Sequence, residues 1–184
     1  YAIFPSFSAG WNLDKEAFFK ENKVLNSFKL RASWGQNGND QFGRRFAYLS
    51  TVNSTDKTYH FGTGDETLLV GSSPDQLANR NLKWETSEQL DLGFDLRALN
   101  SRLNFSADYY IKTTKNLLLV DGNIIAPPSL GMGVPSINAG TVQNKGFEFE
   151  MGYSDKTAGG FSYGIDLNLS TLKNEVTDIN YVGD

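Results

Sequence analysis

The sequence predicts an all-β chain of antiparallel strands, each with one apolar and one polar face. Three observations support this fold class: apolar residues at every second position, apolar bands of similar length, and connections that alternate between long and short. The clearest alternation covers residues 89–98, where every even position is apolar and the odd positions are polar, charged or glycine. Successive side chains of a strand point to opposite faces, so such a segment has one apolar face and one polar face.

The expected elements follow one another along the chain. Residues 3–13 show a weaker form of the pattern, and a short helical turn with Asp14 as its N-cap is expected after them. Further strands are expected over residues 28–35, 89–98, 103–112, 147–153 and 161–169. Their apolar faces consist of Phe28, Leu30, Ala32 and Trp34; Leu90, Leu92, Phe94 and Leu96; Leu103, Phe105, Ala107, Tyr109 and Ile111; Phe147, Phe149, Met151 and Tyr153; and Phe161, Tyr163, Ile165, Leu167 and Leu169.

The length of the apolar bands suits a membrane. Each band is roughly nine residues long, and a tilted strand needs roughly 9–11 residues to cross a bilayer. Aromatic residues lie at or near the band ends, where outer-membrane barrels carry aromatic girdles. These residues are Trp34, Tyr153, Phe161 and Tyr163.

The connections separate two interpretations of the pattern. A soluble β-sandwich, whose apolar faces meet in a core, explains the alternation equally well. However, short links after residues 98 and 153 alternate with long links over residues 36–83 and 113–146. Bacterial barrels have this asymmetry, with short periplasmic turns and long outer loops. A long loop of this kind is uncommon in a compact soluble domain. We therefore expect a segment of an antiparallel transmembrane β-barrel.

Composition limits the possible functions. The net charge of −4 argues against nucleic acid as a partner, because such a partner needs a clustered basic surface. The 184 residues include no cysteine, which excludes disulfides and thiolate metal sites within them. About six spanning strands are too few to close a barrel, for which about eight is the usual minimum. We therefore expect a piece of a larger barrel.

Catalytic, cofactor and metal sites are not expected. The single histidine, His60, lies in a polar stretch and supplies neither a Ser-His-Asp triad nor a multi-histidine metal site. Two pairs of carboxylates, Glu148 with Glu150 and Asp91 with Asp95, share a strand face, as a glycosidase would need. Basic residues are expected on the same side: Lys29, Arg31, Arg97 and Lys112. A wall of alternating charge facing water is therefore the simpler interpretation.

Ligand or partner contacts are expected in the long connections, because binding residues concentrate on loops held by a scaffold. Amide groups and aromatic rings suit sugars, and arginines suit peptide carboxylates. A solvated loop with turn-forming Asn and Gly explains the same residues. Residues 127–135 form a second candidate, for contact with protein. The candidate residues of the first connection are Gln36, Asn37, Asn39, Asp40, Arg44 and Arg45.

Several segments resemble a known family. Residues 4–11, Phe-Pro-Ser-Phe-Ser-Ala-Gly-Trp, are similar to a barrel segment of SusC/RagA-type TonB-dependent outer-membrane transporters. The same holds for Lys29-Leu-Arg-Ala-Ser-Trp-Gly-Gln and for Trp84-Glu-Thr-Ser-Glu-Gln-Leu-Asp. Residues 108–119 and 138–148 add two further matches, all in the order that the family has. Together these signatures cover nearly the whole chain.

The resemblance implies a fold and a function. The family forms a plugged barrel of about 22 strands, and residues 1–184 would be its C-terminal part, without the plug, the TonB box and the final strands. It implies import of oligosaccharides or peptides across the Gram-negative outer membrane, without an enzymatic step. The implied partners are a SusD-like surface lipoprotein, TonB, the cargo and outer-membrane lipid. The cargo class stays open, and a soluble β-sandwich that binds carbohydrate is the alternative function.

Overall fold

The computed structural model describes residues 2–19, 24–40, 46, 48–60, 68–119 and 127–179. Antiparallel strands dominate these residues, which divide into two compact units. The first unit contains Tyr1–Gly38, Thr86–Lys115 and Thr141–Asp178. The second contains Asn39–Glu85 and Asn116–Gly140. Among the described residues, no helix is long and apolar enough to span a membrane.

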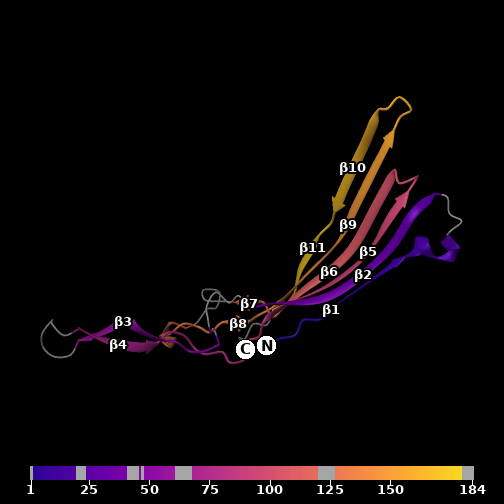
Figure 1. Ribbon diagram of the computed structural model, residues 1–184. Helices are drawn as coiled ribbons and strands as arrows, with labels where there is room; N and C mark the ends of the chain where they lie inside the picture. Colours follow the sequence, from indigo (N-terminus) through magenta and orange to yellow (C-terminus); the bar gives the residue numbers. More distant parts are fainter. Residues whose placement is uncertain are drawn as a thin grey trace. The chain divides into compact units, whose positions relative to one another are not determined.

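The first unit is a seven-stranded sheet with the order β1-β2-β5-β6-β9-β10, in which β11 also pairs with β9. Figure 1 shows these strands lying side by side. The pairs β1–β2, β5–β6, β6–β9, β9–β10 and β9–β11 are antiparallel. The bounds are β1 (Ser6–Asn12), β2 (Leu25–Asn39), β5 (Glu85–Ala98), β6 (Leu103–Lys115), β9 (Thr141–Lys156), β10 (Ser162–Ser170) and β11 (Lys173–Asp178).

The strand register places like residues opposite each other. Ala107 of β6 pairs with Phe94 of β5 on one side and with Phe149 of β9 on the other. One position further on, Asp108 pairs with Gly93 and with Glu148. Because cross-strand partners project to the same face, the sheet has one continuous apolar face and one continuous polar face. The predicted two-faced strands are confirmed.

No second layer covers the apolar face among the described residues. Its side chains are open to the surroundings, with exposed fractions of 70% for Phe7, 60% for Ile165 and 64% for Leu169. The buried hydrophobic residues are only alanines, and no large side chain of the described residues is fully buried. A β-sandwich would bury these side chains in a dry core. The soluble sandwich alternative therefore has no support in the structure.

The two predicted short connections are confirmed. Leu99, Asn100 and Ser101 turn the chain from β5 into β6 with φ values of 57°, 58° and 63°. Between β9 and β10 the turn includes Gly160, whose φ of 90° suits glycine. Both turns lie at one end of the sheet, so the long connections leave from the other end.

The predicted N-cap at Asp14 is wrong. The segment after β1 forms two short 3-10 helices, Leu13–Lys15 and Ala17–Phe19, and Asn12 is the residue that precedes the first. Asp14 instead accepts a hydrogen bond from the backbone N–H of Phe28 at 3.4 Å, so its carboxylate tethers the segment to β2.

The second unit contains strands that the sequence analysis placed in plain connections. The strands β3 (Val52–His60) and β4 (Leu68–Pro74) pair antiparallel, and β7 (Leu118–Leu119) pairs with β8 (Ile137–Asn138). The candidate segment 127–135 includes a 3-10 helix at Pro128–Leu130. It is tied to the first long connection by the backbone hydrogen bond from Gly133 N–H to Asp75 O at 2.7 Å.

Candidate functional site: the polar wall of the sheet

The polar face of the sheet carries charged side chains from five strands of the first unit. We call this face the polar wall. By register and side-chain contacts it includes Lys29, Arg31 and Ser33 of β2; Gln89, Asp91, Asp95 and Arg97 of β5; Ser106, Asp108 and Lys112 of β6; Glu148 and Glu150 of β9; and Asp166, Asn168 and Ser170 of β10. The predicted wall of mixed charge is therefore present.

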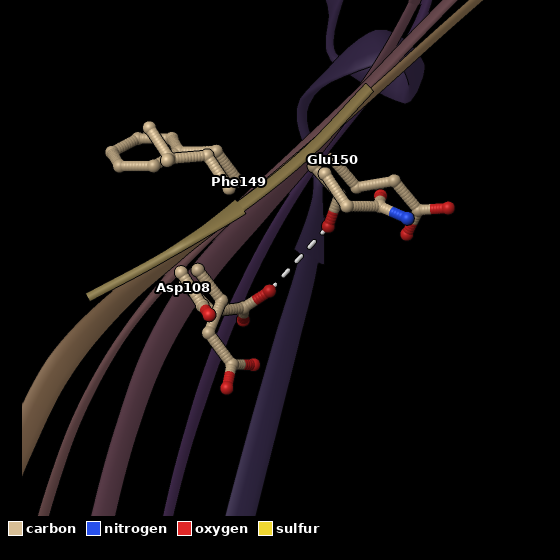
Figure 2. A pocket seen from close by; sticks show the side chains of 8 residues that line it. Asp108, Phe149 and Glu150 are labelled. Atoms are coloured by element: carbon tan, nitrogen blue, oxygen red, sulfur yellow. Dashed lines mark hydrogen bonds between the residues drawn. The ribbon is translucent and has the colours of Figure 1, made fainter. Parts of the chain in front are cut away.

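An acidic depression lies on the wall across β6, β9 and β10. Its volume is about 340 Å³, and its polar lining consists of Ser106, Asp108, Glu148, Glu150, Asn168 and Ser170. Figure 2 shows that Phe149 projects to the other side of its strand from Asp108 and Glu150. Consecutive residues of β9 therefore place the Phe149 ring and the Glu150 carboxylate on opposite faces of the sheet, as the alternation predicts.

The depression is open to solvent and is lined by carboxylate, amide and hydroxyl groups. Within the described part of the chain, no group of three or more His, Asp or Glu side chains is arranged to hold a metal ion. The wall has a structure suited to contact with a polar solute or surface.

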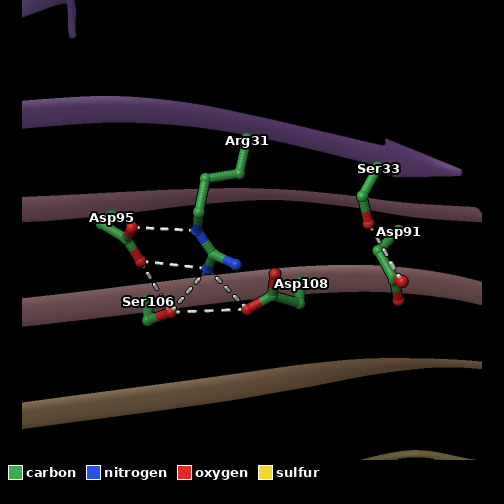
Figure 3. A network of polar contacts seen from close by, with 6 residues as sticks. All are labelled: Arg31, Ser33, Asp91, Asp95, Ser106 and Asp108. Carbon is green, nitrogen blue, oxygen red and sulfur yellow. Dashed lines mark hydrogen bonds and ion pairs between the residues drawn. The ribbon is translucent and has the colours of Figure 1, made fainter. Parts of the chain in front are cut away.

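A single arginine joins three residues of the wall. Arg31 donates from Nε to Asp95 Oδ2 at 2.9 Å and from Nη2 to Asp95 Oδ1 at 3.0 Å. The same Nη2 donates to Asp108 Oδ2 at 3.0 Å. Ser106 Oγ donates to Asp95 Oδ1 at 3.2 Å and completes the network, which Figure 3 shows. Bidentate arginine–carboxylate pairs hold both partners in one geometry.

We call Arg31 with its partners Asp95 and Asp108 the arginine clamp. The clamp requires a glycine at position 93, on the strand between Arg31 and Asp108. Arg31 is on β2 and Asp108 on β6, with β5 between them in the sheet. Gly93 of β5 is the register partner of Asp108, and a Cβ at Gly93 would overlap the Asp108 carboxylate. Because Gly93 has no side chain, the Asp108 carboxylate occupies this space and reaches Arg31. Periodicity alone places these residues on one face but does not reveal the contact.

The predicted contact residues of the first long connection are only partly described. Gln36, Asn37 and Asn39 belong to β2, so the expectation that they lie in a loop is wrong, and Asp40 follows the strand directly. The strand continues because its backbone still pairs there; Gln36 N–H, for example, donates to Pro5 O at 2.9 Å. Arg44 and Arg45 lie outside the described residues. His60 ends β3.

Two of these predicted residues line a second depression. Gln36 and Asn37 border a hollow of about 420 Å³ on the wall. The sequence analysis expected Asp91 and Lys112 on this face, but it missed the rest of the polar lining, because these residues come from β1 and β5 and only the sheet register brings them together. The missed residues are Ser6, Ser8, Ser87 and Gln89. Asp91 is held there by Gln89, whose Nε2 donates to both carboxylate oxygens at 3.1 Å.

Comparison with known proteins decides the family. The family described as TonB dependent receptor-like, beta-barrel matches residues 1–184. This chain belongs to the TonB-dependent receptor β-barrel family. Proteins of this family are outer-membrane barrels. In such barrels an apolar sheet face like that of this TonB-dependent receptor segment meets lipid, and a polar face lines the lumen.

Relatives of known name agree with this assignment. The chain is 35% identical over 181 residues to TonB-dependent receptor P3 of Formosa agariphila, covering 97% of this chain. It is 31% identical over 182 residues to TonB-dependent receptor SusC of Bacteroides thetaiotaomicron, covering 97% of this chain. The chain spans only 17% of the length of each of these two relatives.

Solved structures confirm the all-β fold. The RagAB peptide importer in its closed-closed state matches 97% of this chain and 18% of its own, with a TM-score of 0.75 at 23% identity. Its open-open state matches with the same TM-score of 0.75. The strands described above therefore follow the arrangement of a segment of the RagAB peptide importer.

Proposed function

We propose that this chain is a wall segment of a transporter that imports large polar nutrients across the outer membrane. The observation that carries the proposal is the sheet itself: an exposed apolar face on one side and a hydrogen-bonded charged wall on the other. A sheet of this kind suits a boundary between hydrocarbon and a water-filled passage. We infer no covalent step, because a passage moves its cargo without bond chemistry.

The cargo is inferred to be an oligosaccharide or a peptide. The second depression presents hydroxyl, amide and charged groups, among them Asn37, Gln89 and Lys112. Such groups exchange hydrogen bonds with sugar hydroxyls or with peptide amides. One structural neighbour is called a peptide importer, which supports the peptide class.

The complete protein is proposed to work with two protein partners. A SusD-like surface lipoprotein would cover the outer mouth of the barrel and capture cargo. TonB would supply energy through a segment outside residues 1–184. Support comes from the family, whose description includes TonB, and from the two-component name RagAB of the structural neighbour.

Uptake in living cells tests this function. The gene that encodes the complete protein is deleted, and cells receive fluorescent oligosaccharides and peptides in parallel. We expect uptake of one cargo class to fall at least tenfold, to return with the intact gene, and to stop when a protonophore removes the energy that TonB uses. Equal uptake of both classes with and without the gene would contradict the proposal.

A further inference from the structure

A pair of lysines faces outward at one end of the apolar face. Lys145 of β9 pairs directly with Lys173 of β11, and Lys145 also pairs with Ile111 of β6. Ile111 in turn pairs with Leu90, a member of the apolar face. Because register partners share a face, both ammonium groups belong to the lipid-facing side and not to the polar wall.

This arrangement is unfavourable without a counter-charge. Directly opposite residues of antiparallel strands have Cβ atoms about 4.5–5.5 Å apart, and like charges at such positions destabilise a sheet. Lys173 Nζ lies 2.9 Å from Glu175 Oε2, which compensates one of the two charges. Among the described residues, no carboxylate lies within ion-pair distance of Lys145. Glu175 also interacts electrostatically with Lys145, so the two lysines share one carboxylate and the three side chains carry a net charge of +1.

The lysine pair lies at the level of a membrane interface. Two residues back toward the membrane centre, the rings of Phe147 and Tyr109 pack in a tilted arrangement on the same face, with centroids 4.6 Å apart. At the same end of the sheet, the indole of Trp34 donates to Glu88 Oε1 at 2.9 Å. Glu88 Oε2 also lies 3.0 Å from Lys115 Nζ. Tryptophan and long basic side chains are typical of the boundary between hydrocarbon and headgroups.

The connections identify which leaflet this interface belongs to. The lysine pair lies at the end of the sheet from which the long connections between β2 and β5 and between β6 and β9 leave. In bacterial barrels the long connections are on the outer side. The lysine pair therefore faces the headgroups of the outer leaflet.

We propose that Lys145 and Lys173 bind the phosphate group of an outer-leaflet lipid, whose acyl chains lie against Phe147. The two ammonium groups would donate charge-assisted hydrogen bonds to phosphate oxygens and remove their mutual repulsion. A lipid satisfies both parts of the surface at once, because its headgroup is anionic and its chains match the exposed apolar face. A soluble anion would match only the lysines.

The lipid preference of the purified barrel tests this proposal. The complete protein in mild detergent is titrated with bisphosphorylated lipid A and with the same lipid after removal of its phosphates, and bound lipid is counted by native mass spectrometry. Attraction of about 1 kcal/mol for each basic residue near a charged surface corresponds to about a fivefold change in affinity. We therefore expect Lys145→Gln and Lys173→Gln each to weaken binding about fivefold, with Lys145→Arg keeping wild-type affinity.

A matched control separates this site from general charge effects. Lys112 lies one residue from Ile111 on β6 but points to the polar wall, so Lys112→Gln removes the same charge from the other face. We expect Lys112→Gln to leave lipid binding unchanged. Equal losses in Lys112→Gln and Lys145→Gln would overturn the proposal. So would unchanged binding in the double variant of Lys145 and Lys173, or displacement of the lipid by inorganic phosphate at equal concentration.

Discussion

The carboxylate of Asp108 on β6 lies 3.0 Å from Nη2 of Arg31 on β2, although β5 separates the two strands. Arg31 holds Asp95 of β5 at the same time, so a single guanidinium connects three strands. The side chains of Arg31 and Asp108 are 37% and 25% exposed. Water therefore partly screens the clamp in this segment. We expect it to contribute to the free energy of unfolding as a well-oriented network of surface ion pairs does.

Arg31→Gln should destabilise the barrel by about 1 kcal/mol, because it removes the bidentate pair and leaves Asp95 and Asp108 near each other without a cation. The midpoint of urea unfolding of the complete protein in lipid vesicles measures this loss. Arg102→Gln is the control, since the Arg102 guanidinium has, among the described residues, one ion pair, from Nη1 to Asp155 Oδ2 at 3.1 Å. An equal loss in both variants would show that the clamp has no special role.

Gly93→Ala should cost about 1 kcal/mol, because the new methyl group pushes the Asp108 carboxylate away from Arg31. The cost should largely disappear when Asp108 is already alanine, and a double-mutant cycle measures this coupling. Gly164→Ala is the control, since its Cβ would meet Tyr153 O at an ordinary distance of 3.4 Å. Additive effects of Gly93→Ala and Asp108→Ala would refute the spatial relationship.

Gly146→Ala should damage the sheet more than Gly93→Ala does. The new Cβ would overlap the backbone oxygen of Thr171, which cannot swing away as a side chain can. At this point the chain passes from β10 to β11, and Thr171 N–H donates to Phe147 O at 2.8 Å. We expect a loss of about 2 kcal/mol or more from strain and lost pairing. Unfolding equal to the wild type would contradict the close approach.

Leu167→Lys should destabilise the folded barrel by about 2–4 kcal/mol, the cost of a charged side chain on the lipid face near the bilayer centre. Asn168→Lys, one residue away on the polar wall, should change stability by less than about 1 kcal/mol, because its ammonium stays in water. The fraction of protein that remains folded in detergent on an unheated gel gives a simple measurement. Equal sensitivity at the two positions would argue against the two-faced sheet.

The sequence predicted the faces of the strands well. The alternation predicts which side chains share a face of the sheet. The register confirms this, because Leu92, Phe105 and Ile165 lie on the apolar face as expected. The same information does not predict strand ends. β9 begins at Thr141, six residues before the expected start, because backbone pairing continues where both faces are polar.

The alternation of apolar and polar residues does not predict which residues of distant segments contact each other. Arg31, Asp95 and Asp108 were on the expected face, but their meeting depends on sheet order and on the space above Gly93. The hairpin of β3 and β4 was missed because Val52–His60 is mostly polar and lacks an apolar face. Its threonines and tyrosine carry strand propensity, which was the available signal.

The central claim is that alternate residues of each strand face lipid and water. Nitroxide labels on single cysteines introduced at Ile165, Asp166 and Leu167 of the complete protein in bilayers test it most directly, by the collision of each label with oxygen or with a water-soluble nickel complex. We predict high oxygen contact at residues 165 and 167 and high nickel contact at residue 166. The reverse pattern, or equal contact at all positions, would contradict the account.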